Sequence, residues 1–357
     1  METSAFGDLI KANLVGIVLN WENQFNGQDE TDRTPYYYDR FFRREYSASG
    51  DFSTVETDNS VPMAYVIDYD SPLPLIKGQA IKIYNGEIPK IGVEIQRTEK
   101  QLTEMNDLLL RNNDFSTTQL LRRLFTPLKK VYLAQKERLE WMGLQLISNG
   151  FAETSPLVNT GTNIRIEANY PVANQLNASV IWGQTGYTPL TDLYAASAAS
   201  KWKIKKFLMD RTSFNYVANS DEAKTLFNPL AFSAIGGLNL EQLNMVLLAQ
   251  YGFIIEIIER EVTIQKNGVD NTLNPWQAGQ VVGIENDDLG ACVWAPLAEA
   301  LDKAKAADYA TAEEMFLLRM YKVVHPAYGE FTSSQSRSAC VLTRPTSMFK
   351  LDTTAVA

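Results

Sequence analysis

The feature that most constrains the fold is one long amphipathic run from Ser116 to Gly150. Its apolar positions recur at alternating steps of four and three, which is the spacing of one helix face, and only Gln135 among them is polar: Leu121, Phe125, Leu128, Tyr132, Gln135, Leu139, Met142 and Leu146. Ser116-Thr117-Thr118-Gln119 has the pattern of a capping box, and Asn149-Gly150 that of a left-handed stop. A helix over 116–149 would be ~50 Å long, which is unusual inside a compact domain.

Two features of this predicted helix have alternative interpretations. Pro127 either kinks one continuous rod, because the bond to the carbonyl of Arg123 is lost, or lies in the first turn of a new helix capped by Thr126. Basic residues spaced by seven also line a face beside the apolar stripe: Arg122, Lys129 and Lys136. That face is more typical of a solvated helix surface than of a contact with an acidic partner or with packaged nucleic acid.

The first sixty residues have a different texture. Ser4 to Asn20 predicts a short amphipathic helix, with apolar residues at spacings of three and four. From Glu22 to Ser60 the chain is rich in Asn, Asp, Ser and Thr, yet it holds a group of aromatic residues: Tyr36, Tyr37, Tyr38, Phe41, Phe42 and Tyr46. So much aromatic surface with so little periodicity cannot fold alone. We therefore expect residues 1–50 to form an extended arm laid across another surface.

Two Asn-Gly pairs lie between β-rich runs, which is the strongest short-range signal for a hairpin because both residues tolerate positive φ. Asn85-Gly86 separates AIKIY from EIPKIGVEI, and Asn267-Gly268 separates EVTIQ from QVVGI. Between Val61 and Gln96, where residues such as Met63 and Tyr65 alternate with their neighbours, the pattern predicts a long β-hairpin or a loop excursion.

From Thr188 onward, short helices alternate with short strands. One predicted helix begins at Thr188 or Thr191 and runs to Trp202. Two more are predicted over Thr212–Ala218 and Asn239–Tyr251. Predicted strands are KKFLMD (Lys205–Asp210) and FIIEII (Phe253–Ile258), and later MFLLRMYKVV and SACVLT. This texture indicates a second α/β unit followed by a closing β segment.

Composition excludes several classes of function. The 357 residues include 33 Lys and Arg against 42 Asp and Glu, a net charge of −9, so the surface repels phosphate and argues against nucleic-acid binding through a basic face. Between Met1 and Leu19 three charged residues interrupt any apolar run, which predicts neither a signal peptide nor a membrane span. The expectation is a globular protein kept in cytosol-like conditions.

The residues that usually perform catalysis are scarce. His325 is the single histidine, which removes much of the catalytic chemistry that draws on this residue type, and with no carboxylate or nucleophile near it in sequence it is expected to be a hydrogen-bonded turn residue. Cys292 and Cys340 lie 48 positions apart without a CxxC motif, so two buried thiols are expected in place of a disulfide or zinc site. The common phosphate-binding, zincin, nucleophile-elbow and calcium motifs are missing.

The remaining polar and aromatic candidates have ordinary structural interpretations. Glu137 and Glu140 are expected in a surface ion lattice with the basic residues between them. The pairs Asp287-Asp288 and Asp68-x-Asp70 are expected in turns. Four tryptophans are expected as core or interface anchors: Trp182, Trp202, Trp276 and Trp294. We therefore predict no catalytic, cofactor-binding or metal-ligating residues, and no cofactor.

Taken in order, these segments resemble the major capsid proteins of tailed bacteriophages, with the Hong Kong 97-type fold, and in particular the lambda-like capsid protein E group. KERLEWMGLQLISNGF looks like that group's long spine helix, and Trp182 with TPLTDLYAASAAS is similar to the entry into its axial domain. Three later runs are similar to its strands: KFLMDRTSFNYV, YGFIIEIIEREVTIQKNGVDNTLNPWQAGQVVGI and HPAYGEFTSSQSRSACVLTRPTSMFKL. The resemblance covers Asp39 to Leu351, and the region between Glu87 and Asp114 departs from it.

The resemblance implies an α+β Hong Kong 97-type fold with these parts: an N-terminal arm (1–50), an extended β-hairpin loop (51–97), a peripheral domain (98–190 and 305–357) containing the spine helix (116–149), and an axial domain (191–304). It implies a non-enzymatic major capsid protein that self-assembles into pentamers and hexamers of an icosahedral head. The shell would enclose double-stranded DNA without specific binding and without a membrane. Portal, scaffold and decoration proteins would be its partners, and it would assemble in the host bacterial cytoplasm and remain in the virion.

The capsid interpretation carries one structural expectation and leaves two alternatives open. The segment Tyr36–Phe42 and the hairpin tip would clasp neighbouring subunits, so deleting Met1–Ser49 should leave a soluble subunit that cannot form stable shells. An encapsulin-type nanocompartment shares the fold and is the first alternative. A carboxylate-based hydrolase is the second, because fold does not settle function.

Overall fold

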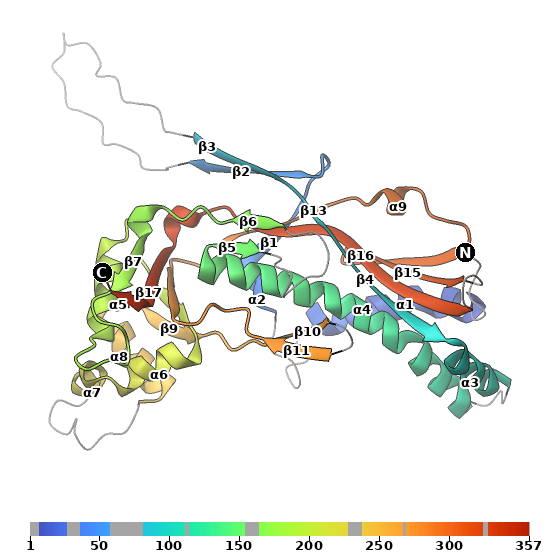
Figure 1. Ribbon diagram of the computed structural model, residues 1–357, viewed down its shortest axis with the longest axis horizontal. Coiled ribbons are helices and arrows are strands. Elements are labelled where there is room, and N and C mark those ends of the chain that lie inside the picture. The colour runs from blue at the N-terminus through green and yellow to red at the C-terminus, as the bar shows by residue number, and fades with distance from the viewer. Residues whose placement is uncertain are drawn as a thin grey trace, which may run out of the picture.

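The computed structural model describes residues 7–26, 36–57, 81–110, 114–153, 164–227, 238–266, 269–323 and 328–356. The chain is elongated, with a large sheet at one end, a small sheet with short helices at the other, and one long helix beside them (Figure 1). No helix within these ranges combines the length and the hydropathy that a membrane crossing requires.

The large sheet and the long helix build the main core. The strand order is β1-β13-β16-β15-β14, and β4 also pairs with β16. The strands are β1 (Phe42–Tyr46), β4 (Lys90–Thr98), β13 (Gly290–Ala295), β14 (Ala307–Ala312), β15 (Phe316–Val323) and β16 (Gly329–Leu342). The long helix α4 (Asp114–Asn149) lies against β16. Seven of the eight predicted stripe positions are fully buried, and Leu121 is half-buried, which confirms the predicted spine helix.

The start and the middle of α4 differ from the prediction, whereas its end agrees with it. The helix begins at Asp114, so Ser116 lies inside its first turn instead of capping it. It continues through Pro127, which excludes a new start at Thr126, and the Thr126 hydroxyl donates to the carbonyl of Arg122 at 2.6 Å. Gly150 ends the helix with a φ of +86°, as the Asn-Gly stop predicts.

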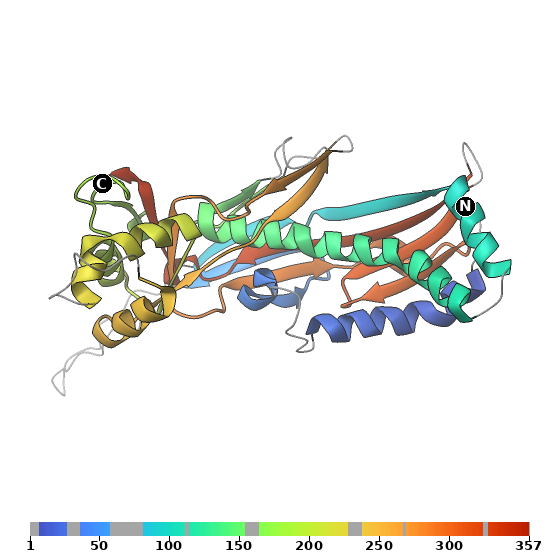
Figure 2. The same ribbon diagram turned by 90° about the horizontal axis from the view of Figure 1, so that it is seen from below.

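Two helices flank this core. The first helix, α1 (Gly7–Asn26), is longer than predicted and packs on β14, with Ile10, Leu14 and Val18 buried. The other, α3 (Glu99–Leu110), packs against α4. Seen from below, α1 and α4 run alongside each other across the sheet (Figure 2).

The small sheet has the order β7-β17-β12-β8-β9 and a core of its own. Its strands are β7 (Gln175–Ala178), β8 (Lys206–Met209), β9 (Ile254–Ile257), β12 (Gln280–Ile284) and β17 (Phe349–Val356). Its helices are α5 (Pro189–Ala199), α6 (Arg211–Asn219), α7 (Asp221–Phe227) and α8 (Leu240–Gln250), which confirms the three predicted there. The α6 N-terminus is capped by Asp210 and that of α8 by a capping box at Asn239.

Three strands lie in a different sheet from the one that the predicted peripheral and axial ranges suggest. β7, within 98–190, and β17, within 305–357, pair with each other in the small sheet, where β17 also pairs with β12. β13, within 191–304, pairs with β1 and β16 of the large sheet. The chain therefore crosses between the two sheets more often than a division by sequence allows, because strand pairing joins segments that are far apart along the chain.

The two Asn-Gly pairs have opposite outcomes. β10 (Val262–Lys266) pairs with β11 (Val269–Leu273) around 267–268, so this hairpin is confirmed, although QVVGI is the separate strand β12. The prediction of a hairpin turn at Asn85-Gly86 is wrong. β3 (Ile81–Glu87) runs straight through it and pairs with β2 (Asp51–Thr57), where Gly86 is opposite Phe52. A Cβ at Gly86 would stand 2.4 Å from the Phe52 ring, so glycine provides room for a ring at this position.

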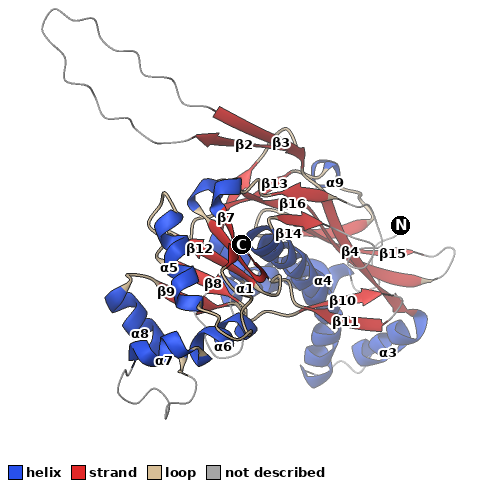
Figure 3. Cartoon of the chain, turned by 60° about the vertical axis from the view of Figure 1, so that its left-hand side comes forward, coloured by secondary structure: helices blue, strands red, loops and turns tan. Residues whose placement is uncertain are grey.

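The remaining elements are short. β5 (Phe151–Glu153) pairs with β6 (Arg165–Glu167), and α2 (Tyr37–Phe41), α9 (Ala298–Leu301) and two 3₁₀ turns, Val172–Asn174 and Pro345–Ser347, complete the described chain. Turned by 60°, the molecule shows the β2–β3 pair projecting away from both sheets (Figure 3). The predicted strand around Met63 and Tyr65 lies outside the described residues.

Candidate functional site: the α2 junction

The aromatic segment that we expected to be an extended arm is instead part of the core. Tyr38 and Phe41 of α2 and Phe42 of β1 are at most 3% exposed and join the cluster formed by α4 and the large sheet. β1 pairs in parallel with β13 over five residues. The arm interpretation is therefore wrong for this segment, because its aromatic surface is buried within its own chain.

A buried glutamate of α4 holds the start of α2. The Glu140 carboxylate accepts hydrogen bonds from the backbone N–H groups of Tyr37, at 3.1 Å, and Tyr38, at 2.8 Å. The first N–H groups of a helix have no partner within the helix, so a carboxylate there replaces the missing acceptors. Burial raises the pKa of Glu140 to about 7, although the two N–H bonds and the charge of Arg260 act to lower it.

The neighbouring carboxylate, Glu137, receives a second set of contacts. It accepts a hydrogen bond from the Tyr36 hydroxyl at 2.9 Å and pairs with the guanidinium of Arg260 at 2.7 Å. The same guanidinium lies 4.7 Å from the centre of the Tyr36 ring, within cation–π distance. The predicted surface lattice of Glu137 and Glu140 is therefore wrong: Glu140 is fully buried, and both anchor the α2 segment.

An ion network lies on the other side of α2. Lys136 of α4 and Glu313, in the turn between β14 and β15, are both 1% exposed and 2.6 Å apart. Arg44 of β1 pairs with Glu313 at 2.8 Å and with Asp39 at 3.1 Å, and Asp39 is also 3.6 Å from Lys136. The Tyr132 hydroxyl donates to Glu313 as well. Removing one partner of such a buried pair lowers the free energy of unfolding by ~3–5 kcal/mol, because the other charge stays buried without its partner.

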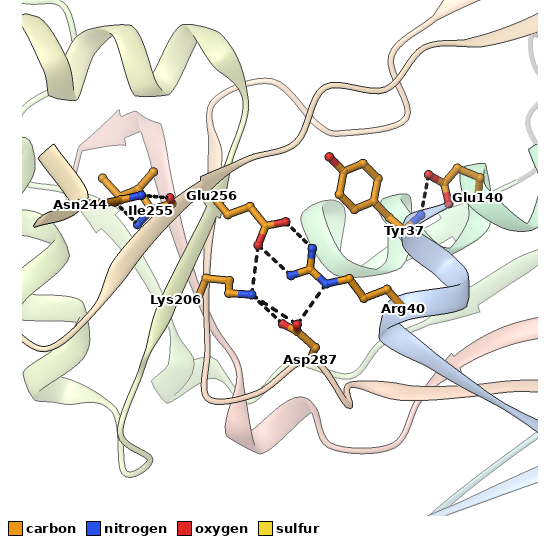
Figure 4. Close-up of polar contacts among 8 residues, drawn as sticks. All are labelled: Tyr37, Arg40, Glu140, Lys206, Asn244, Ile255, Glu256 and Asp287. Carbon is orange, nitrogen blue, oxygen red and sulfur yellow. Dashed lines mark hydrogen bonds and ion pairs between the residues drawn. The ribbon is translucent and has the colours of Figure 1, made fainter. Parts of the chain in front are cut away.

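The third contact joins α2 to the small sheet, as Figure 4 shows. Arg40 donates two hydrogen bonds to the Glu256 carboxylate of β9, at 2.5 Å and 2.7 Å, and a third to Asp287 at 3.0 Å. Lys206 of β8 completes the square, 3.0 Å from Glu256 and 2.9 Å from Asp287. Burial opposes ionisation of both carboxylates, but the bonds from Arg40 and Lys206 outweigh it and lower both pKa values.

We use α2 junction for this site, where the five-residue helix α2 contacts α4, the large sheet and the small sheet. Its cations and carboxylates pair with each other, so the arrangement is suited to holding elements together. The sequence missed it because the partners come from segments that lie far apart along the chain: α2, α4, the β14–β15 turn and the strands β8 and β9. The lone signal was the Glu137/Glu140 spacing, which places both carboxylates on one helix face.

Other predicted candidates have mixed outcomes. Of the basic face, Arg122 is exposed whereas Lys136 is buried, so the solvated interpretation fails for Lys136. Asp287 and Asp288 lie after β12 and pair with basic residues. Trp182 and Trp276 are buried anchors, as expected. His325, Asp68 and Asp70 lie outside the described residues, within which no three His, Cys, Asp or Glu residues are grouped to hold a metal ion.

The whole fold is similar to several solved structures. No family model matches the sequence, and no curated protein matches it. A protein assigned as a prophage capsid protein of E. coli CFT073 is 13% identical, with 95% of this chain and 99% of that chain covered and a TM-score of 0.54. A capsid chain of a native GTA particle is 11% identical, with 91% and 92% covered and a TM-score of 0.50.

A phage-related protein from Bordetella bronchiseptica RB50 is 9% identical, with 95% of this chain and 97% of that chain covered and a TM-score of 0.50. These identities are too low to transfer an activity, but the coverage is nearly complete in both directions. The chain therefore has the fold of phage-type capsid proteins, the Hong Kong 97-type fold that its sequence resembles.

Proposed function

We propose that this protein is the non-enzymatic major capsid protein of a tailed phage or phage-like particle. The observation that carries the proposal is the full-length similarity to a prophage capsid protein, in which almost no part of either chain is left over. A fold by itself does not define a function, so features of the subunit that suit a shell must support it.

The β2–β3 pair is the first such feature. Among the described residues it pairs with no other strand, and it projects from the body (Figure 1). An isolated two-stranded ribbon is marginally stable in water. A ribbon of this kind gains burial when a neighbouring subunit covers it, which is what head-to-tail contacts in a closed shell supply.

An exposed apolar group on the small unit is the second feature. Tyr194 of α5 and Tyr251, next to α8, have ring centres 5.7 Å apart, and Met245 and Leu248 of α8 are also exposed. Exposed apolar groups of this kind mark contact surfaces. In our proposal the small sheet is the axial domain, the large sheet with α4 is the peripheral domain, and β2–β3 is the extended loop.

Charge supports the proposed content of the shell. A net charge of −9 repels DNA phosphates, so the wall would not hold the genome in place during packaging. We propose pentamers and hexamers as the building units, with portal, scaffold and decoration proteins as partners. Assembly would take place in the host bacterial cytoplasm, and the protein would remain in the virion.

Electron microscopy of the expressed full chain, alone and with its own scaffold protein, tests the proposal. We expect closed icosahedral particles, whereas monomers or small dimers under every assembly condition would contradict a shell function. Nuclease-treated particles that contain protein cargo and no DNA would favour a nanocompartment over a phage head. A variant lacking residues 53–85, joined by a short Gly-Ser linker, is the matched control: it should fold without forming particles.

A further inference from the structure

The two cysteines, 48 positions apart in sequence, face each other in the large sheet. The antiparallel register of β13 and β16 places Cys292 directly opposite Cys340. Directly opposite residues point to the same face of a sheet, so both thiols lie on one side. The Cys340 thiol donates to the carbonyl of Leu139 at 3.6 Å, which identifies this side as the one that α4 covers. Both cysteines are free and 0% exposed.

The backbone hydrogen bonds define the kind of pair. The carbonyl of Trp294 accepts from Ser47, which follows β1, so it faces β1 and not β16. The N–H of Ser338, opposite Trp294, donates to Pro89. Because the pattern repeats every two residues, Cys292 and Cys340 also form a non-hydrogen-bonded pair. The Cα atoms of such pairs are ~4.5 Å apart, within the ~4.4–6.8 Å range that a disulfide spans.

We propose that Cys292 and Cys340 form a latent cross-strand disulfide, reduced during assembly and closed by a peroxide-class oxidant. One thiolate attacks hydrogen peroxide, which breaks the O–O bond and gives a sulfenic acid and hydroxide. The second sulfur then attacks the sulfenic sulfur, so that the S–S bond forms as the S–O bond breaks. The departing hydroxide leaves as water with the second thiol proton. Two thiols and one peroxide thus give one disulfide and two waters.

The surroundings make this reaction slow and its product stabilising. Burial, followed by contact with the Cys292 thiol, raises the pKa of Cys340, so little thiolate exists at neutral pH. The pair therefore stays reduced in a reducing compartment and closes during long exposure to oxidant. Closure ties together the neighbouring strands β13 and β16, which lie before and after β14 and β15 in the sequence. A role after particle release rests on the proposed function, whereas closure in the isolated chain does not.

Oxidation of the folded full chain tests the proposal. The reduced protein is incubated natively with hydrogen peroxide, then denatured and alkylated, and its intact mass and thiol-free peptides are measured over time. We expect a mass lower by two hydrogens, no alkylated cysteine, and one cross-linked peptide joining Cys292 to Cys340. The melting temperature should rise by roughly 5–10 °C and return after treatment with dithiothreitol.

Three results would overturn the inference: unchanged free thiols after prolonged treatment, oxygen addition to one cysteine alone, or a disulfide that joins two chains. Cys292→Ser and Cys340→Ala variants should show neither the loss of two hydrogens nor the rise in melting temperature. An equal rise in melting temperature in either variant would also contradict the proposed disulfide. Because the wild-type oxidation is read directly, a variant that folds poorly does not remove the test. Closure without particle formation would leave the inference standing and the capsid function refuted.

Discussion

Two regions that the sequence marked as clasping elements, the α2 segment and the β2–β3 ribbon, have opposite positions in the structure. The α2 segment is buried among α4 and both sheets. Glu140 of α4 accepts hydrogen bonds from the α2 backbone, Lys136 of α4 belongs to the buried ion network beside α2, and Arg40 of α2 pairs with the small sheet. The ribbon pairs only with itself among the described residues and projects from the body.

The difference shows what an aromatic, non-periodic segment does and does not reveal. Tyr38, Phe41 and Phe42 must be buried somewhere, because leaving each of them exposed costs ~1.5–3 kcal/mol. The sequence cannot specify whether their own chain or a neighbour covers them. In α2 the covering residues belong to the same chain, so this segment stabilises the subunit. In our proposal the ribbon is the region that contacts neighbouring subunits.

The largest expected effect comes from two matched deletions. Removing Met1–Ser49 takes β1 and three buried aromatic residues from the core, a loss comparable with the ~5–15 kcal/mol stability of a whole domain. We expect an insoluble or unfolded chain, whereas replacing 53–85 by a Gly-Ser linker should leave the melting temperature nearly unchanged. Circular dichroism and sedimentation would measure both. A soluble, folded chain without Met1–Ser49 would restore the arm interpretation.

Next in size is the buried ion pair. Lys136→Met removes the cation that lies 2.6 Å from the buried Glu313 carboxylate, so we expect a loss of ~3 kcal/mol in the free energy of unfolding. Urea denaturation would measure it. Lys130→Met, at an exposed position of the same helix, should cost less than ~0.5 kcal/mol and serves as the control. Equal losses in the two variants would contradict a stabilising role for the network.

The Glu140 contact should depend on pH. Its pKa of about 7 in the folded chain is above the usual value, so its contribution is fully present below about pH 4.5 and is lost as pH rises through 7. Between pH 5 and pH 8 the wild type should lose ~2–3 kcal/mol more stability than Glu140→Gln, which cannot ionise. Parallel pH profiles of the two proteins, from urea denaturation, would show that Glu140 does not titrate in this range.

The smallest effect is expected at the partly exposed square around Arg40. Arg40→Met should cost ~1 kcal/mol at low salt, and the difference from wild type should shrink at high salt. Arg43→Met is a matched control, since Arg43 pairs with Asp288 but is 69% exposed, and it should change stability by ~0.5 kcal/mol or less. A salt-independent loss at Arg40 would indicate packing of its side chain instead of charge.

Local patterns predicted local structure well. The spacing of Leu128, Leu139 and Leu146 predicted α4, the Asn-Gly stop at Gly150 predicted its end, and the predicted helix from Asn239 agrees with α8. The two Asn-Gly pairs show where such signals fail. At 267–268 the neighbouring runs pair with each other, but at Gly86 the strand instead pairs with β2, opposite Phe52, and that partner decides the outcome.

The α2 junction was beyond prediction for the same reason. Glu140 was interpreted as a surface charge because Lys and Arg surround it in sequence, whereas its partners are backbone groups about one hundred residues away. Cys292 and Cys340 were correctly expected to be buried, but only the register of β13 against β16 places them face to face. Contacts between distant segments depend on strand order and register, which no local pattern encodes.

The sequence by itself determined the long spine helix, the helices α5, α6 and α8 and the strands β8 and β9 of the small unit, the scarcity of catalytic side chains and the acidic charge. These depend on periodicity and composition, which act over a few residues or over the whole chain. Only the tertiary structure decided which aromatic residues are buried within the subunit, which sheet takes β13 and β17, and which carboxylates are buried. Burial, strand pairing and ion pairing between distant segments arise only when the folded chain brings them together and excludes water.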